Sequence, residues 1–489
     1  MVVSFGQSES NRRLGWLLRT SRGSLGLREF AATLGGGIAP STLSRWERGS
    51  AGIGHFAVRG YANALDRPEL VTIADNMARY YGNRLGPGPA LARPPLDPAS
   101  VSTRLDRLIE RATGDDLFSG RDWDALTDLL SRGLVVVSPR STWARLAERL
   151  LAEMAIADGA HWLWRAEALH RLLAHPVGGE IAVATAAAAA ADRATQSLIG
   201  TISVLDATSS GPAASVVMRQ LTNPTSHRSF SGALLSCHRK VRLGHFTRGQ
   251  LVHIGGVLAE LRDQPLAAAI AACLPAQLRK RFGLITKTDR DGARDHRTLI
   301  ETVTASVGGT VHPADQDVLN DLLAEALAAD VFDERMHALF LLHAGPCRVP
   351  IARELGRIMA GRHREPESAI VAEALRKLGG RRERALVEQL VLAAGTRADV
   401  REAAAFALGH IGGESDENFW RAALAITRRW RPGSTTTSTI DRLVYAAGRT
   451  EKRNFLHWVL ATADLPRVAR VSARWWLEIP SHIRLSVTV

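Results

Sequence analysis

Hydroxyl and guanidinium side chains recur at short spacing in residues 40–49, Pro-Ser-Thr-Leu-Ser-Arg-Trp-Glu-Arg-Gly. As a helix, this stretch turns Leu43 and Trp46 to one face and leaves the polar residues on the other. Those polar residues are Ser41, Thr42, Ser44, Arg45 and Arg48. In the major groove of DNA, guanidinium groups fork onto guanine edges, and hydroxyls and amides bind phosphates. The stretch therefore predicts a helix that reads duplex DNA, with Trp46 packed in the core.

A second helix is predicted just before it, over residues 27–35, with Phe30, Ala31 and Leu34 on its buried face. Residues 35–39, Gly-Gly-Gly-Ile-Ala, form the turn between the two. Ala39 has no side chain that can cap a helix, so Pro40 at the first helical position supplies the start signal. The pattern is helix, turn, helix.

Residues 11–66 resemble the Cro/C1-type (XRE) helix-turn-helix family. The small Ala31 and the sequence Trp46-Glu47-Arg48-Gly49 carry the resemblance. It implies base-reading positions at Pro40, Ser41 and Arg45, with Thr42, Ser44 and Arg48 nearer the DNA backbone. Pro40 has no hydrogen to donate, so Ser41 and Arg45 would carry the readout.

The chain departs from the family pattern at two places. The turn of residues 35–39 is two residues longer, and its glycines make the hinge looser. Gly26 and Leu27 stand where the family often has a polar pair that holds a phosphate, which leaves Arg28 as the substitute. Glu47 is expected to bond to backbone groups and not to touch DNA.

Flanking helices are predicted over residues 11–20, 55–65 and 68–81. In the first of them the leucines face inward, and Arg12, Arg13 and Arg19 face outward, where Arg12 and Arg13 would bind phosphates. Residues 1–60 hold eight Arg and three Glu, a net charge of +5. That density supplies the electrostatic term on which DNA affinity depends.

The whole chain of 489 residues carries a formal charge of +13, but it contains five Lys against 57 Arg. Such a bias is typical of a GC-rich genome, so part of the arginine content is codon usage. There is no run of about 18 apolar residues and no signal peptide, which predicts a cytoplasmic, nucleoid-associated protein that does not bind membranes. Cys237, Cys273 and Cys347 are too scattered for a zinc site or a disulfide framework and are expected to be buried free thiols.

Residues 82–98 are rich in proline and glycine and read as a linker. The predicted domains are residues 1–82 for DNA binding, 83–99 for the linker and 100–489 for the remainder. The fold class is all-α: a small five-helix helix-turn-helix domain followed by an α-solenoid. Only residues 134–137 and 483–489 suggest strands, and residues 434–439 suggest a polar loop.

Internal similarity supports the solenoid. Helical segments end at Gly345, Gly379 and Gly412, which are 34 and 33 residues apart, and a second helix follows each of the last two. Glycine tolerates a left-handed cap at a helix C-terminus. The copies over residues 333–449 resemble HEAT-like repeats, whose stacked helix pairs present a binding surface.

Basic clusters mark several predicted helix ends in this region. They either contact DNA or an acidic partner, or complement the helix dipole at C-termini. The tryptophan pairs 162/164 and 475/476 either line a pocket or pack in the core. The basic clusters are Arg279-Lys280-Arg281, Arg362-His363-Arg364, Arg376-Lys377 with Arg381-Arg382-Arg384, and Arg428-Arg429-Trp430-Arg431.

The sequence shows no phosphate-binding loop, no His-Glu-x-x-His and no Gly-x-Ser-x-Gly. Cys237 and His238 are neighbours in sequence, but neighbours on a helix point apart. No enzyme activity, metal or cofactor is expected.

These observations favour a transcriptional regulator that binds double-stranded operator DNA as a homodimer, with the helical repeats sensing a small-molecule or peptide effector or mediating oligomerisation. One alternative is a protein-interaction scaffold tethered to DNA. Another is a DNA-binding component of phage defence or plasmid maintenance.

Overall fold

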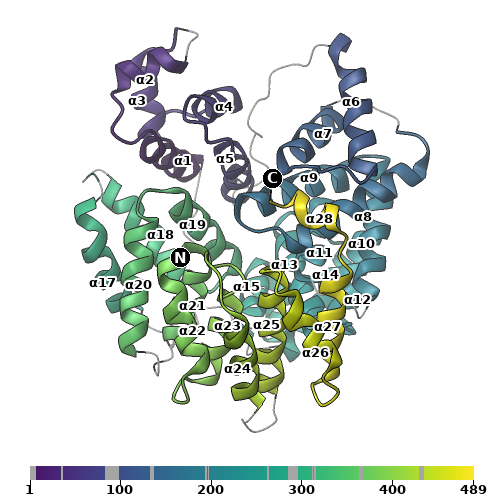
Figure 1. The fold of residues 1–489 in the computed structure, drawn as a ribbon. Coiled ribbons are helices and arrows are strands. Elements are labelled where there is room, and N and C mark those ends of the chain that lie inside the picture. Colours follow the sequence, from purple (N-terminus) through teal and green to yellow (C-terminus); the bar gives the residue numbers. More distant parts are fainter. Residues whose placement is uncertain are drawn as a thin grey trace. The chain divides into compact units, whose positions relative to one another are not determined.

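The computed structural model of the chain consists of helices (Figure 1). It describes residues 7–34, 37–82, 98–132, 137–192, 195, 198–261, 264–284, 296–310, 312, 315–362, 365, 367–428 and 434–488. Within these residues there are 28 α-helices and no strand, so the expected all-α class is confirmed. Nearly all of the predicted linker lies outside the described residues, and the boundaries at 82 and 100 remain predictions.

The chain forms two compact units, and each of them is made of more than one segment of the sequence. The first comprises residues 1–293, 330–332 and 480–489, and the second comprises residues 294–329 and 333–479. The first unit is therefore completed by the last residues of the chain.

The first unit begins with the five helices of the predicted DNA-binding region and continues through eleven more before the C-terminal helix joins it. Its helices are α1 (Gln7–Arg22), α2 (Leu27–Leu34), α3 (Pro40–Glu47), α4 (His55–Ala64), α5 (Glu69–Gly82), α6 (Pro98–Thr113), α7 (Gly120–Arg132), α8 (Arg140–Ile156), α9 (Gly159–Ala174), α10 (Gly178–Ala191), α11 (Leu198–Ser203) with the 3-10 segment η1 (Val204–Ala207), α12 (Gly211–Thr222), α13 (His227–Arg242), α14 (Arg248–Glu260), α15 (Pro265–Cys273), α16 (Ala276–Phe282) and α28 (Ser481–Ser486).

The second unit is a stack of helix pairs. Its helices are α17 (Arg297–Val307) with η3 (Gly308–Thr310), α18 (Gln316–Ala328), α19 (Phe332–Ala344), α20 (Arg348–Arg362), α21 (Glu367–Leu378), α22 (Arg381–Leu392), α23 (Ala398–Ala407), α24 (Glu417–Arg428), α25 (Ser434–Arg449), α26 (Arg453–Ala461) and α27 (Arg467–Glu478). Helices α21, α23, α25 and α27 pack in one layer, and α20, α22, α24 and α26 pack in another. This is the repeat-like arrangement that the glycine spacing predicts.

The repeat glycines do not form the expected left-handed cap, and one of them, Gly379, allows close packing. A positive φ is found at Gly413 and at none of Gly345, Gly379 and Gly412. At Gly379 an added Cβ would lie 2.6 Å from the carbonyl oxygen of Leu375. This helix end is therefore tight for any larger residue.

Two arginines, Arg384 and Arg348, join successive repeats. Arg384, in the first turn of α22, donates to the carbonyls of Leu408 (3.2 Å) and Ile411 (2.9 Å) at the end of α23, and burial lowers its pKa. Arg348 donates in the same way to Leu378 (3.1 Å) and Gly379 (3.2 Å). These contacts satisfy carbonyls that a helix end leaves without partners. Arg384 belongs to one of the predicted basic clusters, and its contacts agree with the role at helix C-termini.

Two sequence predictions about local structure are wrong. Residues 483–488, which alternate apolar and polar like a strand, belong to α28 and the residues that follow it; Ile483 and Ser486, three apart, form its buried face. Residues 434–439 are not a loop but the start of α25, which is held by buried Ile440 and Leu443 further along. Of the predicted strand at 134–137, residues 134–136 lie outside the described residues, and Val137 is not in a strand.

The cysteines are free, as expected, but Cys273 is exposed whereas Cys237 and Cys347 are buried. Trp164 and Trp476 are buried, which supports core packing for these two. In the described part of the chain, no single helix has the length and apolar character to cross a membrane; α9 and α10 meet the criteria only when taken together, and they are bent by 119°.

We expect Arg384→Met to lower the free energy of unfolding of the second unit by about 1–3 kcal/mol, because buried carbonyls lose their donor. Arg382→Met, at an exposed position of the same turn, is the control and should change it by less than about 0.5 kcal/mol. Urea unfolding followed by circular dichroism measures both. Equal effects of the two substitutions would contradict the repeat-joining role.

Candidate nucleic-acid interface

The predicted helix-turn-helix pair is formed by α2 and α3, whose bounds match the expected helices closely. Helix α3 begins at Pro40, and the preceding Ala39 makes no side-chain cap. The predicted start signal is thus confirmed: proline sits where the helix needs no amide hydrogen. Phe30 and Ala31 of α2 are buried, as the apolar spacing predicts.

A buried carboxylate fixes α3 from its inner side. Glu47 is 3% exposed, and both of its oxygens accept hydrogen bonds from Arg22 of α1, each at 2.7 Å. The hydroxyl of Tyr61 on α4 donates to the same carboxylate at 3.0 Å. The expectation that Glu47 bonds to backbone groups is wrong, because its oxygens accept from side chains of two neighbouring helices.

The ionisation of this cluster follows from its geometry. The hydrogen bonds to Glu47 raise the pKa of Arg22. Burial, together with the negative charge of Glu47, raises the pKa of Tyr61. The phenol therefore stays protonated and remains a donor. The ring of Tyr61 also meets Phe30 of α2 edge-on, with centroids 4.8 Å apart, so one residue contacts both helices of the pair.

Two glycines let α1 approach the end of α3. A Cβ on Gly15 would lie 2.5 Å from the carbonyl oxygen of Trp46, and one on Gly49 would lie 2.5 Å from the Cα of Arg12. Gly49 also has a φ of +68°, a conformation that favours glycine. Gly49 belongs to the motif that carries the family resemblance, whereas no sequence pattern points to Gly15.

The outer face of α3 is polar and free of acid. Ser41, Arg45 and Arg48 are exposed, while Pro40, Thr42 and Ser44 are half-buried. Arg48 Nε donates to the carbonyl of Ser44 at 3.1 Å, whereas the Arg45 guanidinium makes no hydrogen bond or ion pair with any residue that the structure describes. The only acidic residue of α3 is Glu47, on the buried side. Arg28 of α2 is exposed as well.

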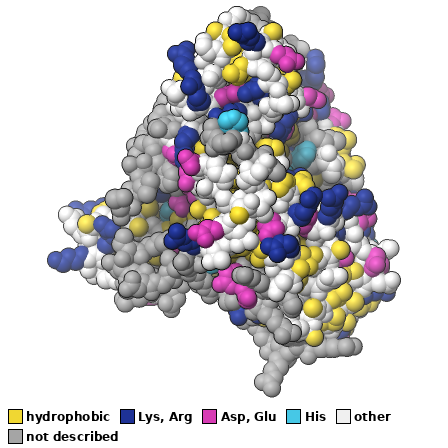
Figure 2. Space-filling view, turned by 90° about the vertical axis from the view of Figure 1, so that its left-hand side faces the viewer, with side chains coloured by type: hydrophobic (Ala, Val, Ile, Leu, Met, Phe, Trp, Pro, Cys, Tyr) yellow, Lys and Arg dark blue, Asp and Glu magenta, His cyan; other side chains and the backbone are white. Residues whose placement is uncertain are grey.

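At the top of Figure 2, the end at which α2 and α3 lie in Figure 1, basic side chains lie among hydrophobic and acidic ones. Trp46 is half-buried, so it is less enclosed than the core position predicted for it.

Two of the arginines of α1, Arg12 and Arg13, were expected to face outward and bind phosphates, and of these two Arg12 keeps exposed surface. Helix α1 begins at Gln7, four residues before the predicted start, and this adds Glu9 to its first turn. Arg13 is fully buried and donates to Glu9 at 2.7 Å, so its predicted outward orientation is wrong. Arg12 is half-buried and donates to both oxygens of Glu9 at 3.0 Å. Burial alone would raise the pKa of Glu9, but the hydrogen bonds from both arginines hold it below its usual range.

Arg22 and Tyr61 were not predicted to contact α3. The signal was present in the sequence: Glu47 lies four residues after Leu43, on the inward face, and a buried carboxylate requires a cation or donors. Chain distance concealed the partners, which are 25 and 14 residues away.

Other constellations offer less chemistry. Cys237, beside His238 in sequence, is buried, and burial raises its pKa so that the thiol is not a nucleophile near neutral pH. Among the described residues no three His, Cys, Asp or Glu side chains gather as metal ligands.

No protein-family profile, curated protein or solved structure matches the chain.

Removing the Glu47 carboxylate should destabilise the first unit. We expect Glu47→Ala to cost about 1–3 kcal/mol, because the Arg22 guanidinium, on a side chain that is 11% exposed, and the Tyr61 hydroxyl both lose their acceptor. Glu29→Ala is the matched control: it removes the same charge from an exposed position of α2. The measurement is urea unfolding of both variants beside the parent chain. A loss as small as that of the control would show that Arg22 finds another acceptor.

Proposed function

We propose that this chain is a sequence-specific DNA-binding regulator of transcription that inserts α3 into the major groove of its operator. The observation that carries the proposal is the division of α3 into two sides. Its one carboxylate is buried against Arg22, while Ser41 and Arg45 face outward with no acidic residue of the same helix beside them.

The division matters because DNA is a polyanion. An exposed carboxylate on the recognition helix would repel phosphates, whereas a buried and paired carboxylate does not weaken the binding of DNA. Arg45 is exposed without an intramolecular partner among the described residues, so it can meet a guanine without first breaking an ion pair. Arg28 on α2 has the same freedom to reach a phosphate.

The contacts within α1 change which arginines serve the interface. Arg13 has no exposed surface to offer, and Arg12 must leave Glu9 to bind a phosphate. The proposed interface is therefore narrower than the sequence suggested. It consists of Arg28, Ser41, Arg45 and Arg48, with Thr42 and Ser44 at its edge.

In this proposal a homodimer reads two half-sites about 34 Å apart. The stacked helix pairs of the second unit suit the sensing of a small-molecule or peptide effector, because such stacks present extended surfaces. The same surfaces suit a protein partner, which keeps the scaffold tethered to DNA as the second candidate. A stoichiometric partner recovered with the chain, together with no footprint on its own promoter, would favour the scaffold.

The test is selection from random duplexes with the full chain, followed by affinity measurements at several salt concentrations. We expect Arg45→Ala to lose about 1–3 kcal/mol of discrimination at one base pair. Arg28→Ala should weaken binding to all sequences alike and reduce the salt slope by about 1. Arg12→Ala should have a smaller effect on that slope, because Glu9 already neutralises it.

The control is Arg248→Ala, which removes an exposed arginine of α14 and should leave both the preference and the salt slope unchanged. If the parent chain selects no duplex, the proposed function is wrong. If it selects one and Arg45→Ala keeps the same preference, the assigned face is wrong.

A further inference from the structure

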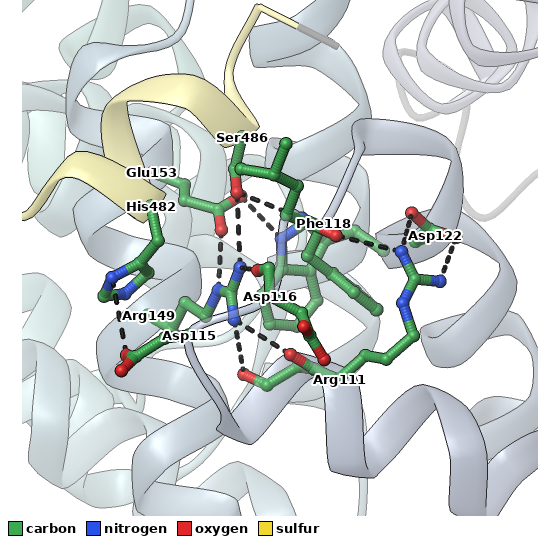
Figure 3. A network of polar contacts seen from close by, with 12 residues as sticks. Arg111, Asp115, Asp116, Phe118, Asp122, Arg149, Glu153, His482 and Ser486 are labelled. Carbon is green, nitrogen blue, oxygen red and sulfur yellow. Dashed lines mark hydrogen bonds and ion pairs between the residues drawn. The ribbon is translucent and has the colours of Figure 1, made fainter.

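The last helix of the chain packs in the first unit, although α27, which directly precedes it, belongs to the second. Its seat is formed by α8, by Arg165 of α9 and by the segment between α6 and α7; Figure 3 shows Arg149 of α8 and Phe118 of that segment beside Ser486.

The seat is a buried cluster of two arginines and one glutamate. Glu153 accepts from Arg149 at 2.8 Å and from Arg165 at 2.8 Å, and it also accepts from the Trp123 indole at 2.7 Å. All three charged residues are at most 7% exposed. One glutamate cannot neutralise two guanidiniums, so the remaining donors need other oxygens.

Ser486 of α28 supplies two of those oxygens, its carbonyl and its hydroxyl. Its carbonyl accepts from Arg165 Nη2 at 2.6 Å, and its hydroxyl oxygen accepts from Arg149 Nη2 at 3.2 Å and from the Phe118 amide at 3.0 Å. At the rim, His482 lies 3.4 Å from Asp115. Figure 3 shows Ser486 directed into the cluster.

The apolar anchorage of α28 is slight. Ile483 is its one buried large apolar side chain, and Leu485 is 52% exposed. A helix of six residues has no stability of its own, since isolated helices shorter than about 12–15 residues are marginal in water. Docking of α28 therefore depends on the buried Ile483 and on the polar contacts of Ser486.

Helix α9 connects this seat to the DNA-binding region. Two positions after Arg165, and so nearly opposite it on the helix, Glu167 accepts from Asn76 of α5 at 3.4 Å. One turn further on, Arg171 lies 3.6 Å from Asp75 of α5 and 2.6 Å from Asp124. One face of α9 thus meets α28, and the other meets α5.

We propose that α28 is a latch: its docking on Arg149 and Arg165 fixes α9 and, through α9, the α5 end of the helix-turn-helix bundle. Release of the latch loosens the α5–α9 contact and changes DNA binding. The change in DNA binding rests on the proposed function, whereas the docking of α28 and its effect on α9 and α5 do not.

The test uses the full chain and hydrogen exchange of the backbone amides. Ile483→Asp puts a charge at the one buried apolar anchor, and Leu485→Asp puts the same charge at an exposed position of the same helix. We expect Ile483→Asp to speed exchange in α28 and, by about fivefold or more, in residues 70–77 of α5. Leu485→Asp should change neither. Faster exchange in α28 with α5 unchanged would overturn the latch.

A second variant guards against general unfolding. If Ile483→Asp also speeds exchange in α14, Ser486→Ala replaces it, since this variant removes only the hydroxyl that Phe118 and Arg149 contact. Its control is Ser481→Ala at the exposed start of α28. Unchanged exchange of α5 in Ser486→Ala would then overturn the proposal.

Coupling is tested directly by combining Ser486→Ala with Asn76→Ala. If the latch acts through α9, the two effects on α5 exchange are not additive; additive effects contradict the route. Affinity for the selected duplex should change by about fivefold on release. If the chain binds no duplex, the proposed function is wrong, but the exchange test of the latch still applies. If exchange in α5 becomes faster while duplex affinity is unchanged, the claim that the latch changes DNA binding is wrong and the docking itself is not.

Discussion

The Glu47 carboxylate, held between Arg22 and Tyr61, is the interaction on which the candidate interface depends. It brings α1, α3 and α4 together at one point, and it does so with the only acid that α3 carries. The pairing thus has two consequences: the helix is fixed from behind, and its front is left without negative charge. Gly15 and Gly49 allow this arrangement because they admit the backbones of α1 and α3 at a distance that any side chain would prevent.

Local sequence patterns predicted most helices of this region, but they did not predict contacts between residues that are far apart in the chain. The apolar spacing of residues 27–35 and 40–49, with Pro40 as the start signal, was sufficient for α2 and α3. The partners of Glu47 come from α1 and α4, and no periodicity within α3 points to them. The wrong orientation predicted for Arg13 follows from the wrong helix start. With the start placed at residue 11, Glu9 lay outside the helix, so no partner was available one turn before Arg13 to hold it inward.

The same contrast holds for the fold. The all-α class and the helix pairs of residues 333–449 follow from composition and a period of 33 to 34 residues. The strand at 483–489 was predicted from alternation alone, but tertiary contacts decide short segments: the oxygens of Ser486 meet the donors of Arg149 and Arg165, and the segment is helical. That the last helix completes the first unit could not be predicted, since it depends on residues more than 300 positions away.

Arginine is used in two ways in this chain, and surroundings, not residue type, decide between them. Arg149, Arg165 and Arg384 are buried, and backbone carbonyls at helix ends or in loops take up their donors. Each such arginine adds to the formal charge of +13 while presenting almost nothing to a solvent-borne polyanion. Net charge therefore overstates the cationic surface available to any polyanion. Arg45 differs because its guanidinium makes no hydrogen bond or ion pair with a described residue, which leaves its donors exposed to solvent.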